Sequence, residues 1–95
     1  MLTSKNKAFL RKASIPLAPS LNLGKGAVDA PIVAAVAAAL EAHELIKIRV
    51  LTNSASPVEA LAQDLSEKTQ AETVAIIGRV IVLYRARKKD PAIVL

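Results

Sequence analysis

The sequence contains no cysteine and only one histidine among its 95 residues. Without cysteine the chain can form neither a disulfide bond nor a thiolate metal site, and one histidine alone does not favour a metal centre. It also has no paired carboxylates, no nucleophile beside a base, and no metal-ligand spacing. We therefore expect a protein that is not an enzyme, without metal or other cofactor and without a small-molecule substrate.

Long apolar runs are missing as well. The longest uncharged apolar stretch, residues 30–40, is far shorter than the roughly 20 residues needed to span a bilayer. The amino end has lysines but not the apolar run of a signal peptide. A chain of this length buries one core. We expect a single domain over residues 1–95, monomeric, cytoplasmic and without a membrane partner.

The charges are unevenly distributed along the chain, which has a formal net charge of +5. Residues 1–28 contain five cations and no acid, residues 29–72 contain seven acids against three cations, and residues 79–90 contain five cations and one acid. If the fold brings the two basic ends together, they form one positive face suited to a polyanion. The alternative is that these cations only keep a small domain soluble.

The first half of the chain predicts two helices and two strands. Thr3 or Ser4 can cap a helix to about residue 14, with Phe9, Leu10 and Ala13 on one side. A short strand over residues 20–23 follows. A helix over residues 30–43 has Asp29 as its cap and a proline in its first turn, and residues 45–51 alternate as in a half-exposed strand.

The second half predicts a helix and a hairpin. Ser56 and Glu59 have the spacing of a capping box, with Pro57 at the first helical position. Strands over residues 72–77 and 80–85 are joined at Gly78 and Arg79 by a type II′ turn. The order αβαβαββ predicts an α/β fold with parallel strand pairs, and the wholly apolar last strand belongs inside the sheet, between the second and third strands.

A glycine loop, Gly24-Lys25-Gly26-Ala27, lies between a strand and the start of a helix. Glycines there allow close approach of the backbone, while free amides, the helix terminus and Lys25 favour a phosphate. A Gly-Lys-Gly turn also arises for conformational reasons alone. It is not a nucleotide-hydrolysing loop, because that loop needs two glycines four residues apart followed by Lys and Ser or Thr.

Several blocks of the sequence together resemble the YhbY-like proteins, which are single CRM (chloroplast RNA splicing and ribosome maturation) domains. The matching blocks are LTSK at residues 2–5, LR at 10–11, GKG at 24–26, ALEAHELIKI at 39–48 and IGRVIVLYR at 77–85. The resemblance implies a two-layer α/β domain similar to the carboxy-terminal domain of translation initiation factor three. For this chain we predict a four-stranded mixed sheet with the order 1-2-4-3, in which the last strand is antiparallel.

The resemblance also implies association with ribosomal RNA in precursors of the large ribosomal subunit, with Gly24, Lys25 and Gly26 in the position of the backbone-contacting GxxG loop of KH domains. Two residues depart from the family's pattern. Ala27 replaces a second glycine, and Asp29 replaces a neutral residue, so both are expected to weaken phosphate binding. His43 stands where an arginine is usual, and we interpret it as a residue interacting with the dipole of its helix.

We predict that the RNA backbone is contacted by cations from several segments, in a manner that depends on RNA shape more than sequence. Besides the residues of the glycine loop, the candidates are Lys5, Lys7, Arg11, Lys12, Lys47, Arg49, Arg79 and Arg85. Each has a plainer interpretation: the charge belongs to an ordinary solvated helix face, prevents pairing at a strand edge, or lies in a turn, where charges are common. Tyr84 could stack on a base but is more typical of a core residue.

Two other classes of function stay open. The second helix has no charge over residues 30–40 and many alanines, which would suit a protein-interaction adapter. Binding of double-stranded DNA is a third possibility.

Overall fold

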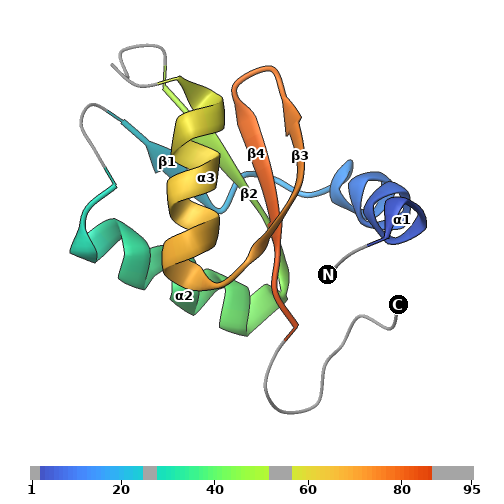
Figure 1. The fold of residues 1–95 in the computed structure, drawn as a ribbon, viewed down its shortest axis with the longest axis horizontal. Helices are drawn as coiled ribbons and strands as arrows, with labels where there is room; N and C mark the ends of the chain where they lie inside the picture. The colour runs from blue at the N-terminus through green and yellow to red at the C-terminus, as the bar shows by residue number, and fades with distance from the viewer. Residues whose placement is uncertain (1–2, 25–27, 52–56, 87–95) are drawn as a thin grey trace.

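A computed structural model describes residues 3–24, 28–51 and 57–86. Within these ranges the chain forms three helices and four strands in the predicted order (Figure 1). They are α1 (Ser4–Ser14), β1 (Leu21–Leu23), α2 (Ala30–His43), β2 (Leu45–Val50), α3 (Val58–Thr69), β3 (Glu72–Ile77) and β4 (Val80–Tyr84). No helix in the described ranges combines the length and apolarity needed to cross a membrane.

The strands form one sheet with the order β1-β2-β4-β3. β1 pairs parallel to β2, whereas β4 runs antiparallel to both of its neighbours. This confirms the predicted mixed sheet and the interior place of the last strand. The reason is that β4 is apolar throughout, so it can be buried against other residues on both of its faces.

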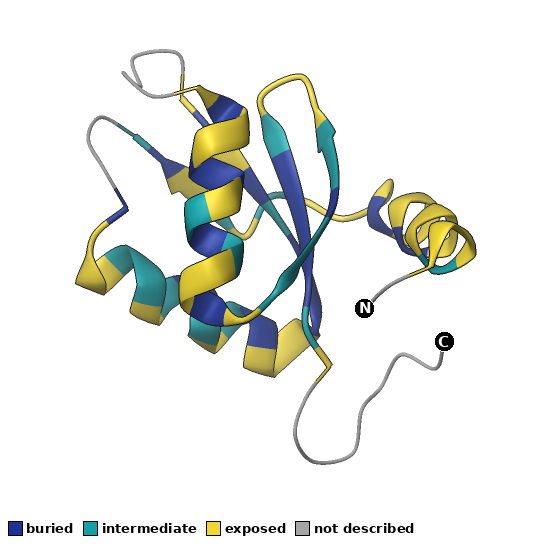
Figure 2. Ribbon diagram, in the orientation of Figure 1, coloured by how far each residue is buried: buried dark blue, intermediate teal, exposed yellow. Residues whose placement is uncertain are grey.

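The two faces of the sheet are covered differently (Figures 1 and 2). α2 and α3 pack on one face and form the expected two layers, while α1 lies across part of the other face. The main core, on the side of α2 and α3, contains Leu23, Val28, Val36, Leu40, Ile46, Ile48, Val50, Val58, Leu61, Ala62, Leu65, Ile81 and Leu83. A smaller core joins Leu10 of α1 to Leu45, Val74, Val82 and Tyr84.

Local signals explain where the first two helices begin. The Thr3 hydroxyl accepts a hydrogen bond from the Asn6 amide at 3.0 Å, and the Asn6 side chain accepts one from the Thr3 amide at 3.3 Å. The Asp29 carboxylate accepts from the Ile32 amide at 3.0 Å, as predicted. These bonds satisfy amides that a helix start leaves without a partner in the helix itself.

Two local predictions are wrong. α3 begins at Val58, and Pro57 is its N-cap rather than its first helical residue, because the extended ψ of 147° at Pro57 places it before the helix. Ser56 lies outside the described residues. On α1 the buried residues are Leu10 and Ser14, whereas Phe9 is 54% exposed. Since α1 covers only part of its sheet face, only one narrow stripe of the helix is buried.

The hairpin turn was predicted correctly. Gly78 has a φ of +60°, and Arg79 does not have a positive φ. A positive φ at the first central residue alone is the pattern of a type II′ turn, which glycine adopts without steric cost.

Candidate nucleic-acid interface

Gly24 and the hairpin tip lie at the same end of the sheet, where the parallel strands β1 and β2 end (Figure 1). Gly24 follows β1, Leu51 follows β2, and the turn of Arg79 follows β3. The Leu51 amide donates to the Leu23 carbonyl at 2.9 Å, and the Val50 amide donates to the Arg79 carbonyl at 2.7 Å. The fold therefore places Gly24, the first residue of the glycine loop, at the same end of the sheet as the hairpin tip. Lys25, Gly26 and Ala27 lie outside the described residues.

Gly24 itself does not need to be a glycine for its conformation. Its φ lies outside the left-handed region, and a Cβ added there would be 3.6 Å from Cδ1 of Leu51, an ordinary contact. Any special role of glycine in the loop therefore rests on its other residues.

Arg79 is exposed at the hairpin tip and is anchored to the end of β2. Its Nε donates to the Val50 carbonyl at 3.1 Å, and its Nη2 donates to the Leu51 carbonyl at 2.6 Å. These bonds use only part of the guanidinium, which has five N–H groups. Arg79 therefore has a structural role, since it ties the hairpin tip to the end of β2. Its contact with RNA stays a prediction.

Lys47 is half-buried on β2, on the sheet face that α1 partly covers. Its Nζ donates to the carbonyls of Ile15 at 3.3 Å and Leu17 at 3.0 Å. The ammonium therefore ties the segment after α1 to the sheet. This use of the charge favours a positioning role, and its predicted RNA contact is not tested by the geometry.

Arg49 lies two residues further along β2 and points to the same face as Lys47. It is exposed and has no hydrogen bond or ion pair with any residue that the structure describes. Its neighbour on β1 is Asn22, which is also exposed. Arg49 is thus a cation available to a ligand on the open sheet face.

Arg85 is not brought together with the other candidates. Its Nη1 donates to the Thr69 carbonyl at 2.8 Å at the end of α3, and its Nη2 donates to the Ala37 carbonyl of α2 at 3.3 Å. Nη2 also lies 3.4 Å from a carboxylate oxygen of Glu41. Arg85 therefore joins the two helices on the side of the sheet opposite α1, and its predicted RNA contact has no support from its position.

The cations of α1 are exposed and have no partner within the described part of the chain. They are Lys5, Lys7, Arg11 and Lys12. The helix contains no acid, so nothing on α1 neutralises this charge. The basic surface predicted for the first helix is confirmed as an exposed surface.

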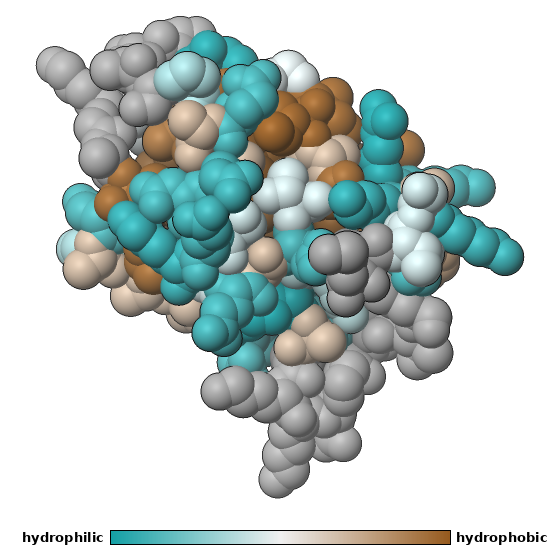
Figure 3. Space-filling view, viewed as in Figure 1, coloured by the Kyte–Doolittle hydropathy of each residue, from teal (hydrophilic) through white to brown (hydrophobic). Residues whose placement is uncertain are grey.

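Acids gather on the other side of the sheet. The helices α2 and α3, with the cap of α2, contain Asp29, Glu41, Glu59, Asp64 and Glu67. Their cations are few: Lys68 pairs with Asp64 at 3.3 Å, and Arg85 packs against their carboxyl ends. Figure 3 views this side and shows hydrophilic atoms over α3. Among the described residues, the sheet thus separates a basic side, with α1, from an acidic side, with α2 and α3.

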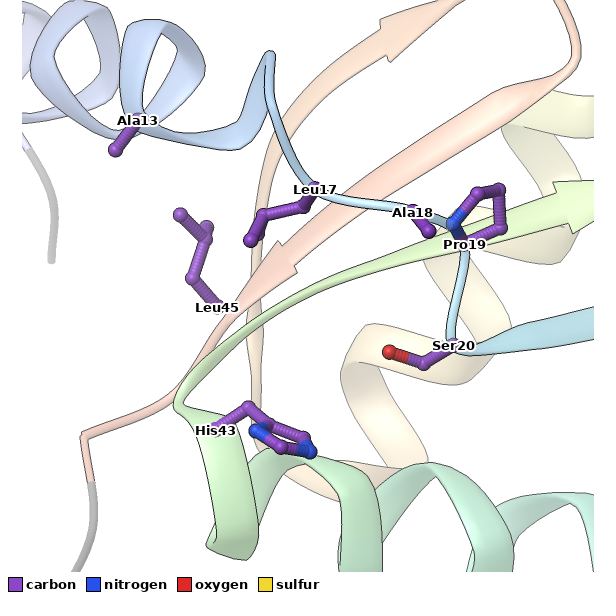
Figure 4. A pocket seen from close by; sticks show the side chains of 7 residues that line it. All are labelled: Ala13, Leu17, Ala18, Pro19, Ser20, His43 and Leu45. Atoms are coloured by element: carbon purple, nitrogen blue, oxygen red, sulfur yellow. The ribbon is translucent and has the colours of Figure 1, made fainter.

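A pocket of about 540 Å³ lies between the end of α1 and the junction of α2 with β2 (Figure 4). Leu17 and Leu45 point toward one another across it, and His43 contributes its ring from the last turn of α2. The lining contains no acid and no second histidine. It therefore holds no acid–base pair, and His43 is placed where the sequence predicted it, at the carboxyl end of its helix.

Tyr84 is buried in the smaller core, as the plainer interpretation predicted. Burial, and then the negative charge of nearby Glu44, raise the pKa of its phenol above the ordinary value of 10.0. A buried ring cannot stack on a base. Among the described residues, no group of three or more His, Cys, Asp or Glu side chains is placed to hold a metal ion.

Comparison with known proteins agrees with this geometry. The sequence pattern of the CRS1/YhbY (CRM) domain matches residues 2–85. The chain belongs to this family. As a CRM-domain protein it is 40% identical over 95 residues to the Bacillus subtilis (strain 168) protein named "Probable RNA-binding protein YqeI", covering 100% of this chain and 99% of that one.

Two further similarities extend the comparison. A Haemophilus influenzae protein named "RNA-binding protein" is 32% identical to this CRM domain over 84 residues, covering 88% of this chain and 85% of its own. The solution structure of protein SAV1595 from Staphylococcus aureus matches with a TM-score of 0.84 and 39% identity, covering 100% of this chain and 99% of the other. The fold described above is therefore the fold of a solved relative.

Sequence reasoning missed part of the basic side of this CRM domain. Asn22 and Ile77 are exposed on the same sheet face as Arg49. Asn22 is directly opposite Arg49, and Ile77 lies two strands away, beyond Val80. The alternation of Leu21, Asn22 and Leu23 was the signal that could have placed Asn22 outward. Ile77 gave no such signal, because β3 is apolar on both faces near its end.

Proposed function

We propose that this CRM-domain protein is a single-domain, monomeric, cytoplasmic RNA-binding protein that associates with ribosomal RNA in large-subunit precursors during ribosome assembly. The names of its relatives support RNA as the ligand. The observation that carries the proposal is the separation of charge across the sheet within the described ranges: α1 has exposed cations without a partner there, and α2 and α3 carry acids.

This separation suits a phosphate backbone for a physical reason. Each phosphate neutralised by a cation releases a condensed counterion, which favours binding, while the acids on the far side repel RNA that approaches from there. The protein then presents one side to the RNA. Backbone contacts of this kind fix orientation and read shape rather than sequence.

We divide the predicted residues by what their side chains already do. Lys5, Lys7, Arg11, Lys12 and Arg49 have no described partner and are assigned to RNA contact. Arg79 is assigned to contact through the unused part of its guanidinium. Lys47 and Arg85 are assigned mainly to holding the fold, because their bonds are internal. The loop of Gly24, Lys25, Gly26 and Ala27 is assigned to phosphate binding on sequence alone.

The experiment that tests the proposal compares charge reversal on the two sides of the sheet. Lys12→Glu on α1 and Lys68→Glu on α3 change the net charge equally. We expect Lys12→Glu to weaken binding to a ribosomal RNA fragment about 5-fold or more, and Lys68→Glu to change it little. Fluorescence anisotropy measures both affinities. Equal weakening would mean that only net charge matters and would reject the basic side as the interface.

Salt dependence tests the electrostatic part separately. If about six phosphates are contacted, the logarithm of the affinity falls against the logarithm of salt concentration with a slope of about −4 to −5. A slope near zero would reject electrostatic binding of the RNA phosphates. Sedimentation of a cell lysate tests the assembly role, which requires that the protein travel with large-subunit precursors.

A further inference from the structure

Four residues lie side by side across all four strands, on the sheet face that α1 partly covers. Asn22 of β1 is opposite Arg49 of β2, Arg49 is opposite Val80 of β4, and Val80 is opposite Ile77 of β3. Side chains that are directly opposite in adjacent strands point to the same face. These residues therefore form one row, which we call the open row.

The open row lies beyond the cover of α1. The helix packs through Leu10 on Leu45, Val74, Val82 and Tyr84, which lie toward the other ends of their strands. In the open row Asn22 and Arg49 are exposed, Val80 is half-buried, and Ile77 is 43% exposed. Three of the four residues are therefore exposed, and Val80 is partly exposed between Arg49 and Ile77.

The row has two chemically distinct halves. Asn22 and Arg49 have no side-chain bond to any described residue, so an amide and a guanidinium face outward unpaired. Val80 and Ile77 offer an apolar surface beside them. Adjacent strands lie roughly 5 Å apart, so the apolar half begins within one strand spacing of the Arg49 backbone.

The charge around the row favours an anionic ligand. Lys47 lies two residues from Arg49 on this face, and α1, which covers another part of the face through Leu10, carries four exposed cations and no acid. Glu72 is the one acid among the described β-strand residues of this face, and it lies at the far end of β3, opposite Tyr84. A ligand with a flat apolar part joined to an anion fits this arrangement, and a nucleotide is such a ligand.

We infer that the open row is a subsite for one unpaired RNA nucleotide, with the base on Val80 and Ile77 and the phosphate at Arg49. The Asn22 amide, which has donors and an acceptor, lies beside the phosphate position where it can bond the ribose or phosphate. This inference rests on the proposed function and deepens it. The preferred RNA carries an unpaired nucleotide beside a helix, because a base inside a duplex cannot lie flat on a protein surface.

The test compares two RNA hairpins that differ only in the presence of one base. Both carry one bulged nucleotide in the stem, and in the second hairpin this nucleotide is abasic, so the backbone charge is the same. We expect the protein to bind the intact hairpin about 3- to 10-fold more tightly. This gain is at the low end of what a base gains by stacking on an aromatic side chain, because Val80 and Ile77 are aliphatic. Fluorescence anisotropy under one salt condition measures both affinities.

Matched variants locate the subsite. Ile77→Thr keeps a β-branched residue in the strand but removes apolar surface, and Ile15→Thr makes the same change at a site that is 70% exposed and outside the row. Ile77→Thr is expected to abolish the preference for the intact hairpin while leaving affinity for the abasic hairpin unchanged. Ile15→Thr is expected to leave both unchanged. Circular dichroism verifies that both variants fold.

The outcomes separate this inference from the proposed function. Equal affinity of the wild-type protein for both hairpins would overturn the subsite but would not contradict the proposed binding of the RNA backbone. A preference that survives Ile77→Thr, or that Ile15→Thr removes as well, would also overturn it. Failure to bind either hairpin would overturn both the subsite and the proposed function.

Discussion

The guanidinium of Arg79 donates a 2.6 Å hydrogen bond to the main-chain carbonyl of Leu51. This bond joins the tip of the hairpin to the residue that follows β2. Leu51 in turn is bonded through its amide to Leu23, directly before the glycine loop. A change at Arg79 should therefore lower stability and alter the position of Leu51 beside Leu23, at the end of the sheet where the glycine loop begins.

We predict that Arg79→Met lowers the free energy of unfolding by about 1 kcal/mol. Hydrogen bonds from charged groups contribute about 1.5–3 kcal/mol, and exposure to solvent reduces that contribution here. Urea unfolding measures the change. Arg49→Met is the control, because Arg49 has no described partner. An equal loss in both variants would contradict a specific role for the Arg79 bonds.

Lys47 and Lys12 should show opposite effects. Lys47→Met removes the bonds to the carbonyls of Ile15 and Leu17, so we expect about 1 kcal/mol less stability and little change in RNA affinity. Lys12→Met removes a free cation, so we expect weaker RNA binding and unchanged stability. Urea unfolding and anisotropy on both variants check this. If Lys47→Met weakens RNA binding as much as Lys12→Met without loss of stability, the positioning role is wrong.

Much of the fold was predictable because its signals are local. Thr3, Asp29 and Gly78 each mark a helix start or a turn through chemistry within a few residues. The interior place of β4 followed from its uninterrupted apolar sequence. Phe9 was misplaced because a helix pattern shows which residues are apolar but not how wide a surface the rest of the protein offers to cover them.

The candidate site was less predictable for a related reason. The alternation of β2 correctly separates Lys47 and Arg49 from the core residues between them. It cannot show that Lys47 donates to two carbonyls from a distant segment, whereas Arg49 has no hydrogen bond with any described residue. The same holds for Arg85, which binds carbonyls of two helices. Glu44, buried at the junction of α2 and β2 with a φ of 64°, was counted only as one more acid of the middle segment.

Tyr84 should make stability fall at alkaline pH. Its pKa is raised above 10.0 in the folded protein, mainly by burial and also by Glu44. Above pH 10.0 the unfolded chain loses the phenolic proton while the folded chain keeps it, so this contribution to stability is complete below 10.0 and is lost as pH rises through the folded pKa.

Absorbance titration can observe this directly, because the chain has a single tyrosine. The native protein should ionise at higher pH than the protein in concentrated urea. Tyr84→Phe should flatten the pH dependence of the unfolding free energy above pH 10. Coincident titration curves for the native and unfolded chains would refute the raised pKa.

Asp29 should oppose RNA binding while it caps α2. Asp29→Asn keeps an acceptor for the Ile32 amide but removes the negative charge. Because Asn caps helices about as well as Asp, stability should change little, and RNA affinity should rise about 2- to 5-fold. Asp64→Asn on α3 is the control with the same change in charge. If both variants gain equally, the gain reflects net charge and not the start of α2.

The placement of acids and cations on opposite sides of the sheet also limits how many nucleic acids one copy can hold. A molecule with cations on every side could bridge two RNA segments and draw them together into aggregates. In the proposed function, a second RNA segment that approaches the described residues of α2 and α3 meets carboxylates and is repelled. The protein is therefore suited to cover one RNA segment without joining it to another.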